Sequence, residues 1–97
     1  MRHAAAGLQM ADQESLIQYP TDFPIKVVGI NQEGFEAAIA QVLRTHAPDF
    51  DVTSMQVRES RAGKYLSISA TITARSRSQL DALYMELTRH PMVRVVL

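Results

Sequence analysis

The stretch KYLSISATITAR, residues 64–75, decides the fold because its apolar and polar residues alternate without a break. Strict alternation predicts a strand with one face buried and the other face in water. Tyr65 and the odd-numbered residues through Arg75 then occupy the solvated face. The inward side chains are expected to be Leu66, Ile68, Ala70, Ile72 and Ala74.

The hydrophobic period changes directly after this strand. SRSQLDALYMELTRH, residues 76–90, repeats at i, i+3, i+4 and i+7, which predicts an amphipathic helix. Either Ser76 with Gln79 or Ser78 with Asp81 approximates a capping box at its start. The apolar stripe consists of Leu80, Leu83, Tyr84 and Leu87. A proline ends this helix, and the last residues, MVRVVL, indicate a final strand.

The residues upstream supply the other three elements. YPTDFPIKVVG, residues 19–29, alternates from Phe23 and predicts a first strand that points Phe23, Ile25 and Val27 inward. A helical period then runs to Pro48, with Asn31 as the expected N-cap. Residues 52–59 indicate a second strand with Met55 and Val57 inward, and SRAG forms the turn into residues 64–75.

The resulting order, β-α-β-β-α-β, is that of a ferredoxin-like α+β fold. We therefore expect a two-layer sandwich with a four-stranded antiparallel sheet and two helices on one face. Residues 19–97 form this single domain, and residues 1–18, which lack any sustained period, are expected to be a disordered tail.

Composition excludes several classes of protein. The 97 residues include ten basic and ten acidic side chains, so the net charge gives no general attraction to nucleic acid or to anionic membranes. No cysteine is present to form a disulfide, a thiolate nucleophile or a cysteine-ligated metal site. No apolar stretch reaches the length of a signal peptide core or a membrane span, and we expect a soluble, cytoplasmic protein.

The titratable residues form no recognisable catalytic constellation. His46 and His90 each fall at the end of a predicted helix, where an imidazole interacts favourably with the helix dipole. Neither has an acidic residue at metal-ligand spacing, so helix capping is favoured over metal binding. Asp49 and Asp51 belong to a loop, where solvated turn residues are the ordinary explanation. The sequence therefore predicts a protein that is not an enzyme and has no metal and no cofactor.

The turn after the first strand offers a candidate ligand site. Gly29, Asn31 and Gly34 match the spacing of the G-x-D/N-x-x-G turn, which resembles that of ACT domains, regulatory modules that often bind amino acids beside it. In the alternative, Gly29 relieves a strand end and Asn31 caps the helix. Free backbone N–H groups at the helix start favour a small carboxylate ligand in either case.

Longer segments resemble a named family. YPTDFPIKVVG, HAPDF, GKYLSISATITA and LYMELTRHPMVRVVL are similar to the YbeD-like family of small bacterial proteins, over about residues 16–97. The resemblance implies a ferredoxin-like fold related to ACT regulatory domains, without an established activity. It also implies a link to lipoate metabolism through the gene setting of the family.

The face of the sheet that no helix covers is the second candidate site. We expect it to carry Val28, Met92 and Val96, and to gather basic residues with no acid. The basic and aromatic members of this open sheet face are Lys26, Arg58, Tyr65, Arg75 and Arg94.

Three functions fit this architecture. The first is a regulatory or ligand-sensing domain of the ACT-like type, and the second is an adaptor that docks a protein partner through the open face or an edge strand. RNA binding is disfavoured, because Tyr65 alone offers a stacking platform on the central strands. The second and fourth strands are expected to be the sheet edges, and we expect a weak homodimer through an edge or the open face.

Overall fold

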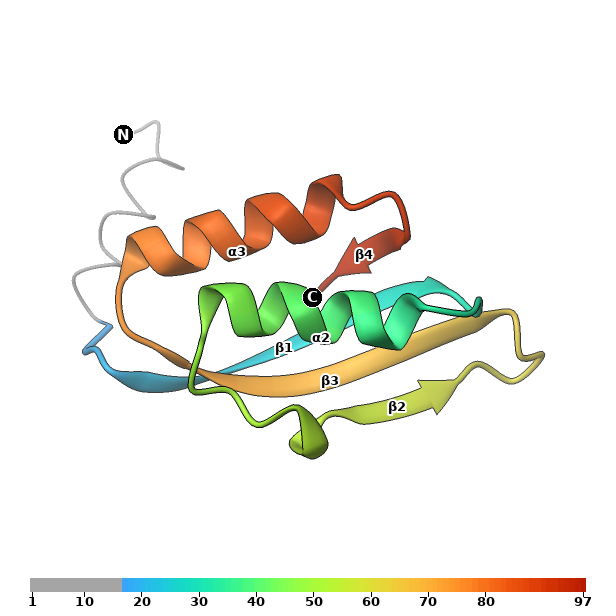
Figure 1. The fold of residues 1–97 in the computed structure, drawn as a ribbon, viewed down its shortest axis with the longest axis horizontal. Coiled ribbons are helices and arrows are strands. Elements are labelled where there is room, and N and C mark those ends of the chain that lie inside the picture. The colour runs from blue at the N-terminus through green and yellow to red at the C-terminus, as the bar shows by residue number, and fades with distance from the viewer. Residues whose placement is uncertain (1–16) are drawn as a thin grey trace, which may run out of the picture.

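The computed structural model describes residues 17–97. The tail expected over residues 1–18 lies outside the described residues except for Ile17 and Gln18. Figure 1 shows the fold with its helices and strands labelled. The elements in chain order are β1 (Thr21–Ile30), α2 (Phe35–His46), the 3-10 helix η1 (Val52–Ser54), β2 (Gln56–Glu59), β3 (Tyr65–Ala74), α3 (Arg77–Arg89) and β4 (Val93–Val96). The predicted ferredoxin-like order is confirmed.

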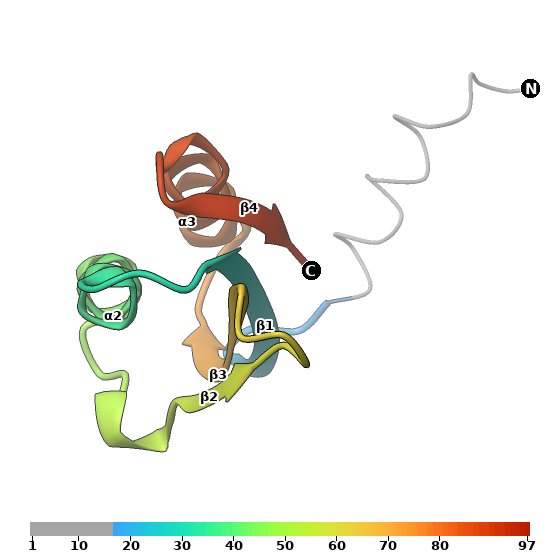
Figure 2. The same ribbon diagram turned by 90° about the vertical axis from the view of Figure 1, so that its right-hand side faces the viewer.

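The four strands form one antiparallel sheet in the order β2-β3-β1-β4. The end-on view shows α2 and α3 on the same face of this sheet, and no helix of residues 17–97 lies on the opposite face (Figure 2). β1 and β3 are central and pair over their whole length, from Thr21 opposite Ala74 to Ile30 opposite Tyr65. The edges are β2 and β4, as predicted.

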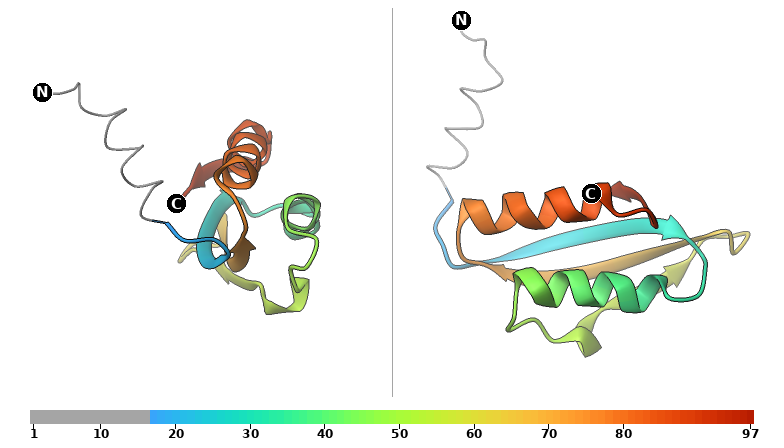
Figure 3. Two further views of the ribbon diagram at one scale, coloured as in Figure 1. Left: turned by 90° about the vertical axis from the view of Figure 1, so that its left-hand side faces the viewer. Right: turned by 45° about the horizontal axis from the view of Figure 1, so that its top comes forward.

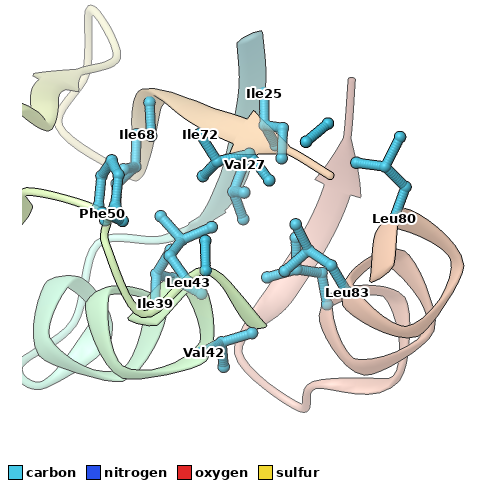
Figure 4. Packing of buried hydrophobic residues seen from close by; sticks show 14 of the residues in the cluster. Ile25, Val27, Ile39, Val42, Leu43, Phe50, Ile68, Ile72, Leu80 and Leu83 are labelled. Carbon is cyan, nitrogen blue, oxygen red and sulfur yellow. The ribbon is translucent and has the colours of Figure 1, made fainter. Parts of the chain in front are cut away.

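The core lies between the sheet and the two helices (Figure 4). Every predicted inward residue of β3 packs here, with Leu66 partly exposed at the strand's start. Burial of one such side chain stabilises the fold by about 1.5–3 kcal/mol. The largest fully buried side chains are Phe35, Ile39, Leu43, Ile68, Ile72, Leu83, Leu87 and Val27.

The segment predicted as a strand over residues 52–59 divides into two elements. Val52–Ser54 is the 3-10 helix η1, and the strand begins only at Gln56. The Asp51 side chain caps η1 by accepting a hydrogen bond from the Thr53 backbone N–H at 3.0 Å. Val57 faces the helices opposite Ile68, as predicted, yet it is 40% exposed because β2 lies at the edge of the sheet.

A β-bulge changes the facing of β4. Val96 lies opposite Val27 and Val95 opposite Val28, but the next pair is Val93 with Gly29, which leaves Arg94 as an extra residue. The expectation that Met92 and Val96 lie on the open face is therefore wrong: both pack against the core. Val95, 44% exposed, takes the open-face position instead.

The start of α3 is fastened to the end of α2, and the right view of Figure 3 shows these two helix ends at the same end of the sheet. Ser76 is the N-cap and accepts from the Gln79 backbone N–H at 3.1 Å, the first of the two predicted capping pairs. The Gln79 side chain accepts from the Arg75 N–H at 2.6 Å and donates to the His46 carbonyl at 2.9 Å. One glutamine thus joins β3, α2 and α3.

Candidate binding surfaces

Gly29, the first residue of the candidate ligand turn, is buried under an aromatic ring. A Cβ at this position would lie 2.4 Å from the Met92 carbonyl oxygen and 2.5 Å from Cε1 of Phe35. The position therefore requires glycine so that α2 and β4 can pack against the end of β1. The residue presents no surface to a ligand.

Asn31 does not cap α2, and this prediction was wrong. The helix begins at Phe35 with Gly34 as the N-cap and no side-chain cap. The side-chain amide of Asn31 instead donates to the Gly63 carbonyl at 2.9 Å, and its backbone N–H donates to the Lys64 carbonyl at 2.9 Å. Asn31 therefore fastens the end of β1 to the β2–β3 hairpin.

Gly34 is exposed and has a left-handed backbone, with φ of 89°. It borders a shallow groove of about 520 Å³ between the first turns of α2 and the β2 side of the sheet. Glu33 and Glu36 line the same groove above an apolar floor formed by Ala37, Ala40, Val52, Met55 and Leu66. Two glutamates beside the helix start oppose a carboxylate ligand, so the electrostatics do not favour the predicted small carboxylate at this turn.

The open sheet face is organised in cross-strand rows. One row crosses all four strands through Arg58, Ser67, Val28 and Val95. The next row crosses through Gln56, Ser69, Lys26 and Leu97, with backbone hydrogen bonds of 3.1 and 2.8 Å joining Lys26 to Leu97. Each row thus combines one cation, one small serine and at least one aliphatic side chain.

Two hollows lie along β3 on this face. The larger, about 450 Å³, is lined by Lys26, Gln56, Ser69, Thr71 and Leu97 among others. The smaller, about 150 Å³, is lined by Val28, Arg58, Glu59, Tyr65 and Ser67 among others. The two hollows follow one another along β3, over Ser67, Ser69 and Thr71, and together we call them the β3 channel.

The remaining predicted members of the open face have other surroundings. Arg75 follows the last residue of β3, and its guanidinium pairs with the Asp49 carboxylate at 2.6 Å. Arg94 is the extra residue of the β4 bulge and is exposed. The expected absence of acids is also wrong: β1 begins at Thr21 rather than Phe23, which places Asp22 on the same face as Lys26.

The two histidines within residues 17–97 hold elements together. His46 ends α2, and its Nε2 lies 2.6 Å from Oε1 of Glu86, joining α2 to α3. Local spacing does not reveal this partner, because 40 residues separate the pair. His90 is the C-cap of α3, and its Nδ1 accepts from the Met92 backbone N–H at 3.1 Å. Both histidines thus have structural partners.

The loop carboxylates are also engaged locally. The hydrogen bond from Arg75 lowers the pKa of Asp49 below its ordinary value, against a smaller opposing effect of desolvation. Hydrogen bonds from Thr53 lower the pKa of Asp51. Across residues 17–97, no group of three or more His, Cys, Asp or Glu side chains is placed to hold a metal ion.

Comparison with known proteins identifies the family of this chain. The family model described as "Protein of unknown function (DUF493)" matches residues 14–97. The chain belongs to the DUF493 family. This result confirms the resemblance to the YbeD-like family drawn from the sequence. Relatives of the chain carry the name UPF0250, which is the name of the YbeD-like proteins.

Two bacterial relatives illustrate the match to the DUF493 family. UPF0250 protein NE1487 of Nitrosomonas europaea is 54% identical over 85 residues, which cover 88% of this chain and 98% of the relative. UPF0250 protein RSc0326 of Ralstonia nicotianae is 51% identical over 85 residues, which cover 88% of each protein.

A solved structure supports the fold. The solution structure of protein HP0495 from H. pylori superposes with a TM-score of 0.63 over 84% of this chain and 85% of that one, at 14% identity.

In the part of this DUF493 chain that the structure describes, neither helix is long and apolar enough to cross a membrane.

Proposed function

We propose that the chain is a non-catalytic module that docks a partner protein on the open sheet face. The observation that carries this proposal is the combination of exposed apolar and unpaired basic side chains there. Tyr65, Val95 and Leu97 are 38%, 44% and 68% exposed. Lys26 and Arg58 lie among them, and neither has an acidic partner within residues 17–97. Such a mixed surface is typical of protein interfaces, which combine apolar anchors with arginine and a polar rim.

A ligand-sensing role at the turn has weaker geometric support. Gly29 is buried, the Asn31 amide is already hydrogen bonded, and two glutamates face the groove beside Gly34. The link to lipoate metabolism stays a prediction from the family resemblance. A thermal-shift panel of amino acids, keto acids and lipoate at millimolar concentration tests the ligand-sensing role. A rise in melting temperature that Gly34→Val abolishes would favour sensing over docking.

Site-specific photo-crosslinking in the native host tests the docking proposal. A photoreactive residue replaces Val95 on the open face or, as the control, Met85, which is 52% exposed on α3. We expect a discrete crosslinked product from position 95 and none from position 85. The product should disappear in the double variant Lys26→Glu, Arg58→Glu and persist in Arg44→Glu, Arg89→Glu, which reverses two exposed helix cations. Equal crosslinking from both positions would contradict the proposal.

A further inference from the structure

The β3 channel runs along one strand. Its floor is β3, which lies between two walls, the neighbouring strands β1 and β2, and the larger hollow continues past Lys26 of β1 to Leu97. The two hollows follow one another along β3, with Ser67 in one and with Ser69 and Thr71 in the other. An extended segment has the same rise per residue as the strand beneath it, about 3.3 Å, so it can follow these floor residues in step. We therefore take an extended segment as the occupant.

The floor offers hydroxyl groups rather than bulk. Ser67, Ser69 and Thr71 are small, so the floor lies below the longer side chains of the walls. No side-chain hydrogen bond engages these three hydroxyls anywhere in the described part of the chain. They are available to hydrogen bond with a bound segment.

The walls carry the charge. Lys26 stands on the β1 wall and Arg58 on the β2 wall, one row apart along β3. Two acidic residues lie near these cations: Glu59 lines the smaller hollow beside Arg58, and Asp22 lies beyond Thr71, opposite Thr73. Two cations facing each other across a channel floored with hydroxyls are complementary to anionic groups.

We propose that the β3 channel binds an extended acidic segment of the partner protein. Carboxylates of the segment pair with Lys26 from one wall and with Arg58 from the other, and its polar groups meet the hydroxyl floor. Apolar side chains of the segment contact Val28 and Leu97. A single-stranded nucleic acid would also bring negative charge, but Tyr65 is the only aromatic side chain within residues 17–97 that faces the channel, and base recognition depends on stacking. This assignment rests on the docking proposal and adds the chemistry of the partner.

NMR titration of the labelled protein tests this chemistry with defined probes. The first probe is a short capped peptide that alternates Glu with Ser and Val; the second has Lys in place of Glu, and the third is oligouridylate. We expect the Glu peptide alone to shift the amide signals of Lys26, Arg58, Ser67 and Ser69. Because one exposed ion pair changes affinity by about two- to fivefold, the loss of both pairs in Lys26→Glu with Arg58→Glu should weaken binding by roughly four- to 25-fold. Arg44→Glu with Arg89→Glu should leave it unchanged.

A third variant separates the channel from its charge. Ser69→Tyr fills the floor while both cations remain, and it should also abolish binding of the Glu peptide. Preferential binding of the Lys peptide or of oligouridylate, or Glu-peptide binding that ignores all three variants, would overturn the acidic assignment. If the in-host crosslink at position 95 persists while the Glu peptide fails to bind, docking stands and only the partner chemistry is wrong. If position 95 of the otherwise natural protein yields no crosslinked product in the host, both the docking proposal and the acidic assignment are overturned.

Discussion

The side-chain amide of Asn31 donates a hydrogen bond to the carbonyl oxygen of Gly63, across 32 positions of sequence. This bond and the one from the Asn31 N–H to Lys64 hold the end of β1 against the β2–β3 hairpin. Asn31→Ala should lower the free energy of unfolding by about 0.5–1.5 kcal/mol, the usual net value of one hydrogen bond. Urea denaturation measures the loss, and Gln32→Ala, at an exposed neighbouring position, is the control. Equal stability of the two variants would contradict the fastening role.

Gly29→Ala should be among the most damaging small substitutions in the chain. The added methyl group meets a backbone carbonyl as well as the Phe35 ring, so a rotamer change cannot relieve the overlap. We expect a loss of about 3 kcal/mol or more, the upper end of overpacking costs. Gly63→Ala is the matched control: its φ is 76° and its Cβ has room, so it should cost only about 1–2 kcal/mol. A Gly29→Ala protein as stable as the control would show that α2 packs less closely on β1.

Leu83→Ala tests the packing of α3 on the sheet. Leu83 is fully buried, and truncation of such a leucine costs about 2–5 kcal/mol through lost burial and the remaining cavity. Met85→Ala, at a half-exposed position of the same helix, should change stability by less than about 0.5 kcal/mol. Chemical denaturation of both variants gives the comparison. A loss below about half a kcal/mol for Leu83→Ala would place this helix face in solvent and refute the packing.

Acid should weaken the contact between the end of α2 and the end of β3. Arg75 lowers the folded-state pKa of Asp49 from its ordinary value of 3.8, so the stabilisation is present above that value. It is lost as the pH falls below 3.8 through the folded-state pKa, because the carboxyl group then becomes neutral. The stability difference between the natural protein and Asp49→Asn should therefore be constant from neutral pH to about pH 5 and shrink in stronger acid. Thermal melts across pH measure it, and a difference that grows in acid would contradict the pairing.

The expected weak homodimer can now be tested at the correct position. Val95, rather than Val96, is exposed on the open face, since Val96 lies opposite the core-facing Val27. If two copies associate through this face, Val95→Asp should shift the sedimentation coefficient to that of the monomer, while Met85→Asp on α3 should not. Association that survives Val95→Asp would point to an edge strand. A monomer mass that persists at several hundred micromolar would refute the dimer.

Most of the fold was predictable because its information is local. Strict alternation over residues 64–75 gave the facing of β3 correctly, since one residue of slip would have buried its serines and exposed its isoleucines. The Ser76–Gln79 pair gave the start of α3 for a similar reason: the N-cap and its donor lie within one turn.

The errors concern partners far apart in the chain. The residues of β4 carry no mark of a bulge, which arises where β4 passes Gly29 and the ring of Phe35. Asn31 has the chemistry of an N-cap, but a hairpin carbonyl 32 residues away competes for its amide. The β3 channel was predicted only in part. The sequence indicated the cations of the open face, but only the order of strands shows that Lys26 and Arg58 lie on opposite sides of the serine residues of β3.

The central position of β1 has a consequence for biosynthesis. Among the elements of residues 17–97, β1 is translated first, yet its two neighbours in the sheet are β3 and β4, the latter paired through Val96 opposite Val27. A ribosome must therefore release almost the whole domain before both sides of β1 are hydrogen bonded. Until β4 emerges, one edge of the apolar strand β1 has unpaired backbone groups that can pair with other nascent chains. The chain is therefore vulnerable to aggregation during this interval.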